Sequence, residues 1–437
     1  MRSATLVLGI LTLTPCLSCG QDRDTKVRND RKVFQESKDW IYNDLEEGIR
    51  HAKAAGKPLL VIFRCIPCEA CQQFDDDVAR RDPVIRDLLD AFVCVRIVQA
   101  NAIDLTRFQH DFDQSFAAYL MNADSTIYGR YGTRSDRSEE QDISLEGFRK
   151  AMEGALLMHQ TYDKIKATLA GKQAKPVRYK TPREYPSLAG KYGTTLDYDG
   201  KVAKSCMHCH QIREAERVAY RSENKPIPDN VLFPNPDPSV LGLFLDSRSM
   251  ARVERVSPGS IADKDGVRHG DEIVMMDGQQ LLSIADVQWV LQNLPNSADV
   301  TTLVRRDGKD LPLTLHLSDG WRRGNISWRV STWDLRRMAL GGMKLVNLTE
   351  AERERAKLPK GSLGLRVEHV GEFGDHAIAK QAGLRKDDVI VGFDGRNDHI
   401  GESELIAHAV QKRLPGDKVS VTILRGGVRQ VFHFSLK

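Results

Sequence analysis

The feature that most constrains this chain is a short apolar run followed at once by closely spaced cysteines. Leu59–Phe63 are five apolar residues in a row, a length that suits a buried strand and is too short for a helix. Cys68 and Cys71 then form a C-x-x-C pair, and Gln72 opens a helical pattern. The dipole and free N–H groups of a helix start favour a thiolate, the form of cysteine that attacks disulfides. The pattern predicts redox chemistry, with a structural disulfide or half of a zinc site as alternatives.

A third cysteine, Cys65, lies three residues before Cys68. Its spacing leaves open a role as a third thiol of the redox site. A metal or cluster site built on Cys65, Cys68 and Cys71 is an alternative, although no fourth ligand is evident near them in the sequence. Cys94 lies within an apolar segment, and we expect it to be a small buried residue.

Residues 1–20 have the features of a signal peptide. Arg2 precedes the apolar run Leu6–Leu13, which is too short to span a bilayer, and small residues end the run. The alternative is lipidation of Cys19, and we expect a membrane association only in that case. We therefore expect an exported protein that is periplasmic or associated with the cell envelope, a location that permits disulfides.

The length of 437 residues predicts two to four domains. The net charge of +4 is spread along the chain, so nucleic acid is not an expected partner. Residues 21–32 are charged and poor in apolar residues, which predicts a tether. Further apolar patterns predict, in order, a helix, two strands and a helix, over residues 40–52, 91–98, 115–121 and 148–169. Strands that alternate with helices indicate an α/β layer with helices on both faces, here over residues 33–170.

Residues 171–236 form a connecting segment rich in lysine, proline and tyrosine. It contains a C-x-x-C-H sequence, the attachment signature of c-type haem, in which two thiols form thioethers and the histidine ligates iron. Those residues are Cys206, Cys209 and His210. A redox or structural disulfide, or a zinc knuckle that uses His208 or His210, is the alternative. We predict no metal beyond haem iron.

The last two hundred residues contain an internal repeat, with copies at residues 237–319 and 330–437. Each copy has a glycine loop near its start, an Asp-Gly turn, a helix and a terminal hairpin. The helices are expected at residues 284–294 and 402–414. Short strands bounded by glycine turns predict a β-rich unit with two small helices. The fold class is therefore multidomain, with an α/β unit followed by two β-rich units.

The first unit resembles the thioredoxin superfamily, in particular its exported thioredoxin-7-type branch. The resemblance rests on Trp40, on the strand that begins at Leu59 and on the C-x-x-C pair. It implies that Cys68 attacks a disulfide and that Cys71 resolves the mixed disulfide. Two positions depart from the family: Ile62 replaces a buried aspartate, and Phe116 lies near the place of a cis-proline.

The repeats resemble two PDZ domains of the bacterial protease-associated type. Backbone N–H groups of a glycine loop in such domains hold the terminal carboxylate of a peptide, which adds as a strand beside an edge strand. The matching loops are Leu241-Gly242-Leu243 and Leu340-Gly341-Gly342-Met343. The whole arrangement resembles a family of exported thioredoxin/PDZ fusion proteins, some of which carry selenocysteine.

Two hypotheses come from these resemblances. In the first, the chain is an exported thiol–disulfide oxidoreductase whose PDZ domains bind the C-termini or exposed strands of protein substrates. In the second, it is a non-catalytic PDZ scaffold with a degenerate thioredoxin fold, with or without a c-type haem. The retained C-x-x-C pair favours the first, and the departures at Ile62 and Phe116 favour the second.

Overall fold

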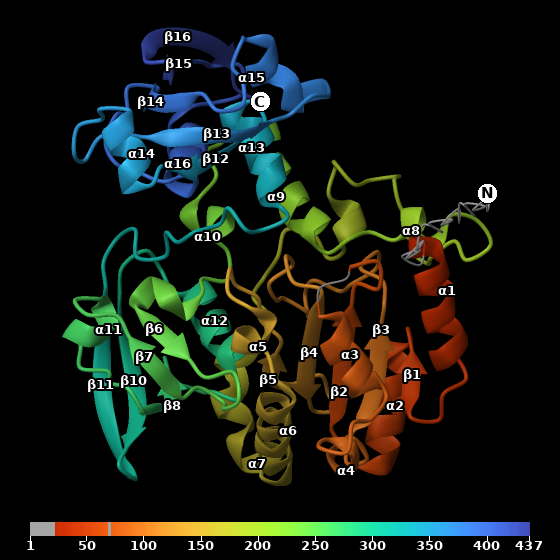
Figure 1. Cartoon of the computed structure of the whole chain (residues 1–437). Helices are drawn as coiled ribbons and strands as arrows, with labels where there is room; N and C mark the ends of the chain where they lie inside the picture. The colour runs from red at the N-terminus through yellow and green to blue at the C-terminus, as the bar shows by residue number, and fades with distance from the viewer. Residues whose placement is uncertain (1–21, 69–70) are drawn as a thin grey trace, which may run out of the picture.

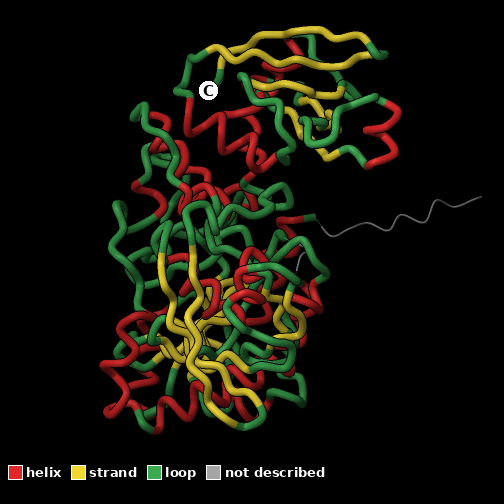
Figure 2. The backbone as a smooth tube through the Cα atoms, turned by 90° about the vertical axis from the view of Figure 1, so that its left-hand side faces the viewer, coloured by secondary structure: helices red, strands yellow, loops and turns green. Residues whose placement is uncertain are grey.

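The structure is a computed structural model, and it describes residues 22–68 and 71–437. The expected signal peptide, Cys19, Glu69 and Ala70 lie outside the described residues. An α/β unit lies beside a β-rich unit, and a second β-rich unit stands apart from both across a connecting segment (Figure 1, Figure 2). Among the described residues, no helix has the length and apolar character that crossing a membrane requires.

The α/β unit is built on one five-stranded sheet in the order β1-β3-β2-β4-β5. Strands β1, β3 and β2 are parallel, and β4 and β5 continue the sheet in antiparallel fashion. Every residue of β2 is buried, which is why its sequence is a continuous apolar run rather than an alternating one. The strands are β1 (Trp40–Tyr42), β2 (Leu59–Arg64), β3 (Val93–Ile97), β4 (Phe116–Met121) and β5 (Ile127–Tyr131).

Helices cover both faces of this sheet, and each face has its own core. Phe74 and Phe148 contribute to one core, whereas Ile49 and Ala52 contribute to the other. The expected α/β layer is therefore present. Its helices are α2 (Leu45–Ala55), α3 (Gln72–Ala79), α4 (Arg86–Leu89), α5 (Glu139–Asp142), α6 (Leu145–Gln160) and α7 (Tyr162–Ile165), followed by the 3-10 helix η1 (Lys166–Lys172).

The helix expected over residues 40–52 begins later than the apolar spacing indicated. Trp40–Tyr42 form strand β1, and α2 begins only at Leu45. The reason is local, because the Asp44 side chain accepts a hydrogen bond from the Glu47 N–H and caps the helix. Asn43, with φ of 55°, turns the chain between the two elements.

The segment expected as a tether contains helix α1 (Arg23–Phe34). Its Val27 is buried among Leu196, Val202 and Cys206 of the connecting segment. Its Asp30 forms an ion pair with the buried Arg96 of β3 at 2.7 Å. A largely polar sequence thus folds as a helix because a few of its residues meet partners far along the chain.

The connecting segment is more ordered than its composition indicates. It contains α8 (Val202–Ser205), α9 (His210–Ser222), α10 (Asp229–Leu232) and the 3-10 helix η2 (Pro182–Glu184). Helix α9 buries Ile212 and Ala215 in a core of the α/β unit. Its buried Arg217 donates to the Ser331 carbonyl oxygen and side chain, so α9 connects the α/β unit to the residue before Thr332, where the second β-rich unit begins.

The first β-rich unit has the sheets β6-β7 and β11-β10-β8-β9 around helix α12. Its 3-10 helix η3 leads through Gly242, at φ of 80°, into β6. The elements are η3 (Pro238–Leu241), β6 (Leu243–Leu245), β7 (Val253–Val256), α11 (Ile261–Lys264), β8 (Glu272–Met276), β9 (Gln279–Gln280), α12 (Ile284–Asn293), β10 (Ala298–Arg306) and β11 (Lys309–Leu317).

The second β-rich unit repeats this order with one five-stranded sheet, β12-β13-β14-β15-β16. Helix α13 takes the place of η3, and a glycine again follows it before the first strand. The elements are α13 (Thr332–Leu340), β12 (Met343–Asn347), α14 (Glu350–Arg355), β13 (Leu365–Val370), η4 (Gly374–Ala377), α15 (Ile378–Gln381), β14 (Val389–Phe393), α16 (Glu402–Lys412), β15 (Lys418–Arg425) and β16 (Val428–Ser435).

A buried ion pair joins the α/β unit to the first β-rich unit. Lys172 of η1 and Asp286 of α12 are 2.7 Å apart, and each side chain is 1% exposed. The Asp286 carboxylate also accepts hydrogen bonds from the Arg130 and Leu282 N–H groups. One carboxylate therefore compensates a buried cation and two backbone donors at this interface.

We predict that Asp286→Ala lowers the free energy of unfolding by about 3–5 kcal/mol, because it leaves Lys172 as an uncompensated buried charge. The matched control is Asp310→Ala, which removes the exposed partner of Arg305 and is expected to cost no more than about 1 kcal/mol. Urea unfolding followed by circular dichroism measures both changes. Equal losses for the two variants would contradict the assignment.

Candidate functional site

A tight turn brings Cys65 and Cys68 together at the end of β2. The Cys68 N–H donates to the Cys65 carbonyl oxygen at 3.1 Å, which closes a four-residue turn. The two Sγ atoms lie 2.7 Å apart. Cys65 is buried and Cys68 is half-buried, so Cys68 is the more accessible of the two.

Arg64, the last residue of β2, fixes both ends of this turn. Its guanidinium donates to the carbonyl oxygens of Cys65 at 2.7 Å and Cys68 at 3.0 Å. It also donates to the Ser115 carbonyl oxygen, which accepts a hydrogen bond from the Cys65 N–H as well. Since the Arg64 side chain is 2% exposed, water does not compete for these hydrogen bonds, and they hold the cysteine backbone in place.

A buried ion cluster lies beneath the turn and compensates Arg64. Asp75 of α3 contacts Arg64 at 3.2 Å and Arg96 at 2.7 Å, and Arg96 also pairs with Asp30 of α1. Two buried guanidinium groups thus meet two carboxylates, which offsets the cost of removing four charges from water. The cluster links the cysteine turn, α3, β3 and α1.

His208 reaches the two sulfurs from the connecting segment. Its Nδ1 lies 3.4 Å from Cys65 Sγ and 3.9 Å from Cys68 Sγ. The fully buried Asn101 positions this segment, since its side chain accepts from the Met207 N–H and donates to the Ser205 carbonyl oxygen. The His208 N–H donates to the Gln211 side chain on its other flank.

The surroundings move the pKa values of the two sulfurs in opposite directions. A hydrogen bond from Cys65 lowers the pKa of Cys68, and His208 and Arg64 lower it further against the effect of burial. The pKa of Cys65 is raised, first by its bond to Cys68 and then by burial. The two sulfurs titrate as a pair, and His208 and Arg64 favour the negative charge on Cys68.

The other four cysteines of the described chain favour the thiol form. Burial raises the pKa of Cys71, and it raises the pKa values of Cys94, Cys206 and Cys209 to about 12. Cys71 is the residue before α3, with φ of 61°, so it occupies the helix start that the sequence assigned to the first sulfur. Its assignment as the resolving thiol stays a prediction.

The residues expected to attach haem are packed against protein. Cys206 is buried among Val27 and Val202, whereas Cys209 packs against the core that contains Ile212. His210 Nδ1 bonds to Glu214 at 2.8 Å. As arranged here, the two thiols face different surroundings, so thioether bonds to one porphyrin would require this segment to repack. Covalent haem on Cys206, Cys209 and His210 stays a prediction.

The two glycine loops are arranged alike, and each precedes an edge strand. The Gly242 carbonyl oxygen accepts from the Ser257 N–H, and the Gly342 carbonyl oxygen accepts from the Gly371 N–H. Because bonding alternates along an antiparallel pair, residues 243 and 245 of β6, and 343 and 345 of β12, direct their N–H groups away from the paired strand. These are the donors that an added peptide strand would use.

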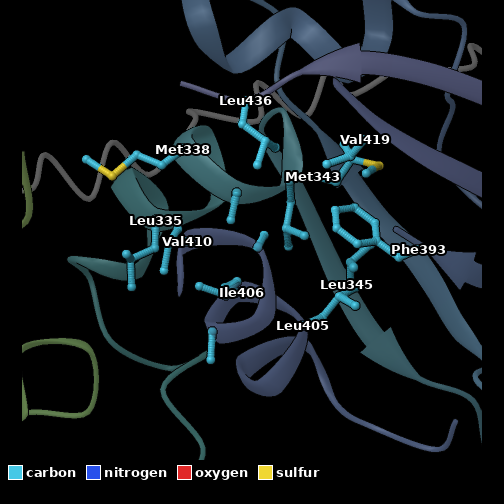
Figure 3. Packing of buried hydrophobic residues seen from close by; sticks show 14 of the residues in the cluster. Leu335, Met338, Met343, Leu345, Phe393, Leu405, Ile406, Val410, Val419 and Leu436 are labelled. Carbon is cyan, nitrogen blue, oxygen red and sulfur yellow. The ribbon is translucent and has the colours of Figure 1, made fainter. Parts of the chain in front are cut away.

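In the second unit, one of these donors is already occupied. The Leu345 N–H donates to Glu402 at 2.7 Å, and Glu402 is held by Arg336 of α13 in a pair that is nearly unexposed. Leu335 and Met338 of α13 lie in the same core as α16 residues (Figure 3). Ile284 and Glu402 are the first residues of α12 and α16, and an isoleucine side chain cannot accept a hydrogen bond.

Comparison with protein families agrees with this geometry. Residues 40–123 match the model of a thioredoxin-like family, and residues 252–306 match that of a PDZ domain. The chain contains a thioredoxin-like domain and a PDZ domain. The PDZ match lies in the first β-rich unit, and the thioredoxin-like match includes β2, the three clustered cysteines and β3.

Two curated relatives are similar over part of the chain. A probable periplasmic serine endoprotease DegP-like of Pseudomonas savastanoi pv. phaseolicola is 28% identical over 44% of this chain and 38% of the relative. The periplasmic pH-dependent serine endoprotease DegQ of Escherichia coli is 29% identical over 34% of this chain and 29% of the relative. The chain thus spans about a third of the length of these relatives.

Among solved structures, the HtrA-type protease AlgW with decapeptide aligns at a TM-score of 0.22 and 20% identity. The alignment covers 36% of this chain and 44% of that chain.

Sequence reasoning missed several residues that build the cysteine site. In the sequence, Arg64 and Asp75 look like ordinary charged residues. Arg64 directly follows an apolar run, and this position indicates that its side chain can be buried with a partner of opposite charge. His208 was considered only as an alternative zinc ligand within its own segment. No local pattern could have placed it against cysteines 140 residues earlier in the chain.

We predict that limited alkylation of the reduced protein at neutral pH labels Cys68 before Cys71. A lowered pKa keeps Cys68 as thiolate near pH 7, and its reactivity should be lost only as the pH falls through that lowered value. The pH midpoint of its labelling rate should lie below about 8.5, the value of an ordinary cysteine, and His208→Ala should raise it. Cys94 is the internal control that stays unlabelled. Labelling of Cys71 or Cys94 first would reject the assignment.

Proposed function

We propose that the chain is an exported thiol–disulfide oxidoreductase whose first β-rich unit recruits protein substrates by their C-termini. The observation that carries this proposal is the half-buried Cys68 next to a second thiol, Cys65, at a sulfur separation of 2.7 Å. His208 and Arg64 favour the thiolate of Cys68. The description of both curated relatives as periplasmic agrees with export.

The chemistry requires two thiols and no other reactant than the substrate disulfide. The Cys68 thiolate attacks one sulfur of that disulfide, forms a mixed disulfide and releases the other sulfur as a thiolate. Cys65 then attacks Cys68 Sγ and releases the second substrate sulfur, and the proton of Cys65 passes to a departing thiolate. Two electrons move to the substrate, and a Cys65–Cys68 disulfide remains.

We expect the substrate to approach from the side of the turn that carries Ile66, a residue that lies between the two cysteines in the sequence. A cavity of about 270 Å³ between α1 and α3 is lined by Ile66, Arg64 and Gln72. Its position next to the turn supports access of an extended peptide segment to Cys68.

We predict that Cys68→Ser lowers the rate of disulfide reduction at least about 100-fold, since no other described cysteine has a lowered pKa. Cys65→Ser should instead accumulate a mixed disulfide at Cys68, because the second step loses its nucleophile. Cys71→Ser is the matched control and should resolve normally. Intact mass of the protein after incubation with a peptide disulfide measures each species.

If the mixed disulfide accumulates in Cys71→Ser and is resolved normally in Cys65→Ser, the resolving role belongs to Cys71, as the family resemblance implies. An unchanged rate in Cys68→Ser would move the attacking role to another cysteine, and a parent rate no higher than the uncatalysed rate would leave the non-catalytic scaffold as the function.

The second β-rich unit is, in this proposal, a second PDZ domain whose groove is closed. The shared order of glycine loop, edge strand, helix and terminal hairpin supports the fold assignment, although the second unit adds α14 between its first two strands. Glu402 and Arg336 contact the edge of β12 where a peptide would add, and in this proposal the N–H groups of Leu243 and Leu245 in β6 receive the ligand instead. Peptide capture is therefore assigned to the loop Leu241-Gly242-Leu243 rather than to Leu340-Gly341-Gly342-Met343.

We predict that the full chain binds peptides with a free C-terminus and that amidation of the peptide abolishes binding. Gly242→Ala should weaken binding at least about tenfold, because a Cβ at this positive φ would lie 2.2 Å from Ser260 Oγ and displace the loop. Gly259→Ala is the matched control, with a similar φ of 73° and open space around the added Cβ. Fluorescence anisotropy with a labelled peptide library measures the affinity. Equal binding of amidated peptides would contradict the assignment of this loop.

A further inference from the structure

We infer that reduced Cys65, Cys68 and His208 form a binding site for a thiophilic metal ion, and that Cu(I) is the ion that suits this donor set. This inference does not depend on thiol exchange, because it requires only that the two cysteines are reduced. It also differs from the metal sites considered in the sequence, each of which used one cysteine cluster alone.

The three donor atoms already lie at the separations of a coordination site. They are all within 4.8 Å of one another, and the nitrogen is 3.4 and 3.9 Å from the two sulfurs. Metal–sulfur and metal–nitrogen bonds of about 2.3 and 2.0 Å place such a pair about 3.5 Å apart. The two sulfurs are closer than that, so binding would separate them by about 1 Å through side-chain rotation.

The number and type of donors favour Cu(I) over Zn²⁺. Thiolate and imidazole are ligands that soft first-row ions prefer. Cu(I) is satisfied by three ligands, whereas Zn²⁺ on two cysteines and one histidine takes a water as its fourth ligand. Neither Cys71 nor Cys206 belongs to this group of donor atoms, and Cys206 Sγ faces the carbonyl oxygens of Val98 and Met207 at 3.9 and 3.7 Å.

The backbone that carries these donors is fixed by buried partners. Arg64 holds both ends of the Cys65–Cys68 turn, and Asn101 holds the chain next to His208. Partners of this kind reduce the reorganisation that binding requires and set the orientation of the ligands. The guanidinium of Arg64 also places positive charge near two thiolates, which would otherwise repel each other.

The site joins two parts of the chain that are far apart in sequence. Cys65 and Cys68 belong to the thioredoxin-like domain, whereas His208 belongs to the connecting segment. A bound ion would therefore fasten the connecting segment to the domain. Oxidation of Cys65 and Cys68 by a substrate disulfide, which is itself reduced to two thiols, would remove two of the three ligands and release the ion, so binding reports the redox state of the cysteine pair.

The test is anaerobic titration of the reduced full chain with Cu(I) against the chelator bicinchoninate. We expect one ion per chain, and affinities at least about 100-fold weaker for Cys65→Ser, Cys68→Ser and His208→Ala. The matched controls are Cys71→Ser and His210→Ala, which should bind as the parent does. His210 is a stringent control because its ring stacks on that of His208 at a centroid distance of 5.6 Å. Absorption spectroscopy at the copper edge should show two sulfur scatterers and one nitrogen scatterer.

Binding that is unchanged in His208→Ala, or lost equally in His210→Ala, would overturn the site. Circular dichroism and urea unfolding of each variant separate lost binding from lost fold. Tighter binding of Zn²⁺ than of Cu(I) in a parallel titration would overturn the choice of ion. Disulfide reduction is measured separately on the metal-free parent chain, because loss of that activity would count against the proposed function and leave the copper titration to decide the metal site.

Discussion

The position of one carboxylate, Asp75, determines much of what the cysteine site can be. It lies between Arg64 and Arg96, and each of these three side chains is almost fully buried. Without Asp75, two guanidinium groups would face each other out of water, a situation that costs several kcal/mol. With Asp75 in place, the charge of Arg64 is compensated, and the other N–H groups of its guanidinium donate to the carbonyl oxygens of the cysteine turn. The geometry of two sulfurs thus depends on a charge that touches neither of them.

The same cluster extends to the connecting segment and explains why a distant histidine reaches the cysteines. Arg96 binds Asp30 of α1, and α1 in turn packs Val27 against Val202 and Cys206. The chain that follows Cys206 is then fixed by Asn101, which places His208. This chain of contacts makes the site composite. A thioredoxin-like domain in isolation would retain the two thiols and lose the group that bridges them.

The sequence was sufficient to predict the elements whose formation is decided locally. The apolar run at residues 59–63 became β2, and the helices expected at residues 284–294 and 402–414 became α12 and α16. By contrast, α2 begins later than the apolar spacing predicts, because Asn43 turns the chain in a left-handed conformation and Asp44 caps the helix. Tertiary contacts decided α1 and α9, and they decided which two of three cysteines meet. Spacing alone cannot distinguish Cys65–Cys68 from Cys68–Cys71, because both pairs are separated by two residues and the choice depends on where Arg64 and Ser115 hold the backbone.

The two β-rich units differ in what contacts the edge strand after the glycine loop. Both units carry a glycine loop, an edge strand and a helix in the same order, so the repeat in the sequence predicts the repeat in the fold. The first helix residue is Ile284 in the first unit and Glu402 in the second. A carboxylate at that position accepts the Leu345 N–H, but it requires a cation because it is buried, and α13 supplies Arg336. Replacement of η3 by the longer α13 and the exchange of isoleucine for glutamate are therefore one structural change. The Leu345 N–H of the second unit is therefore bonded within the unit itself, whereas an isoleucine at the first position of α12 offers no acceptor to β6.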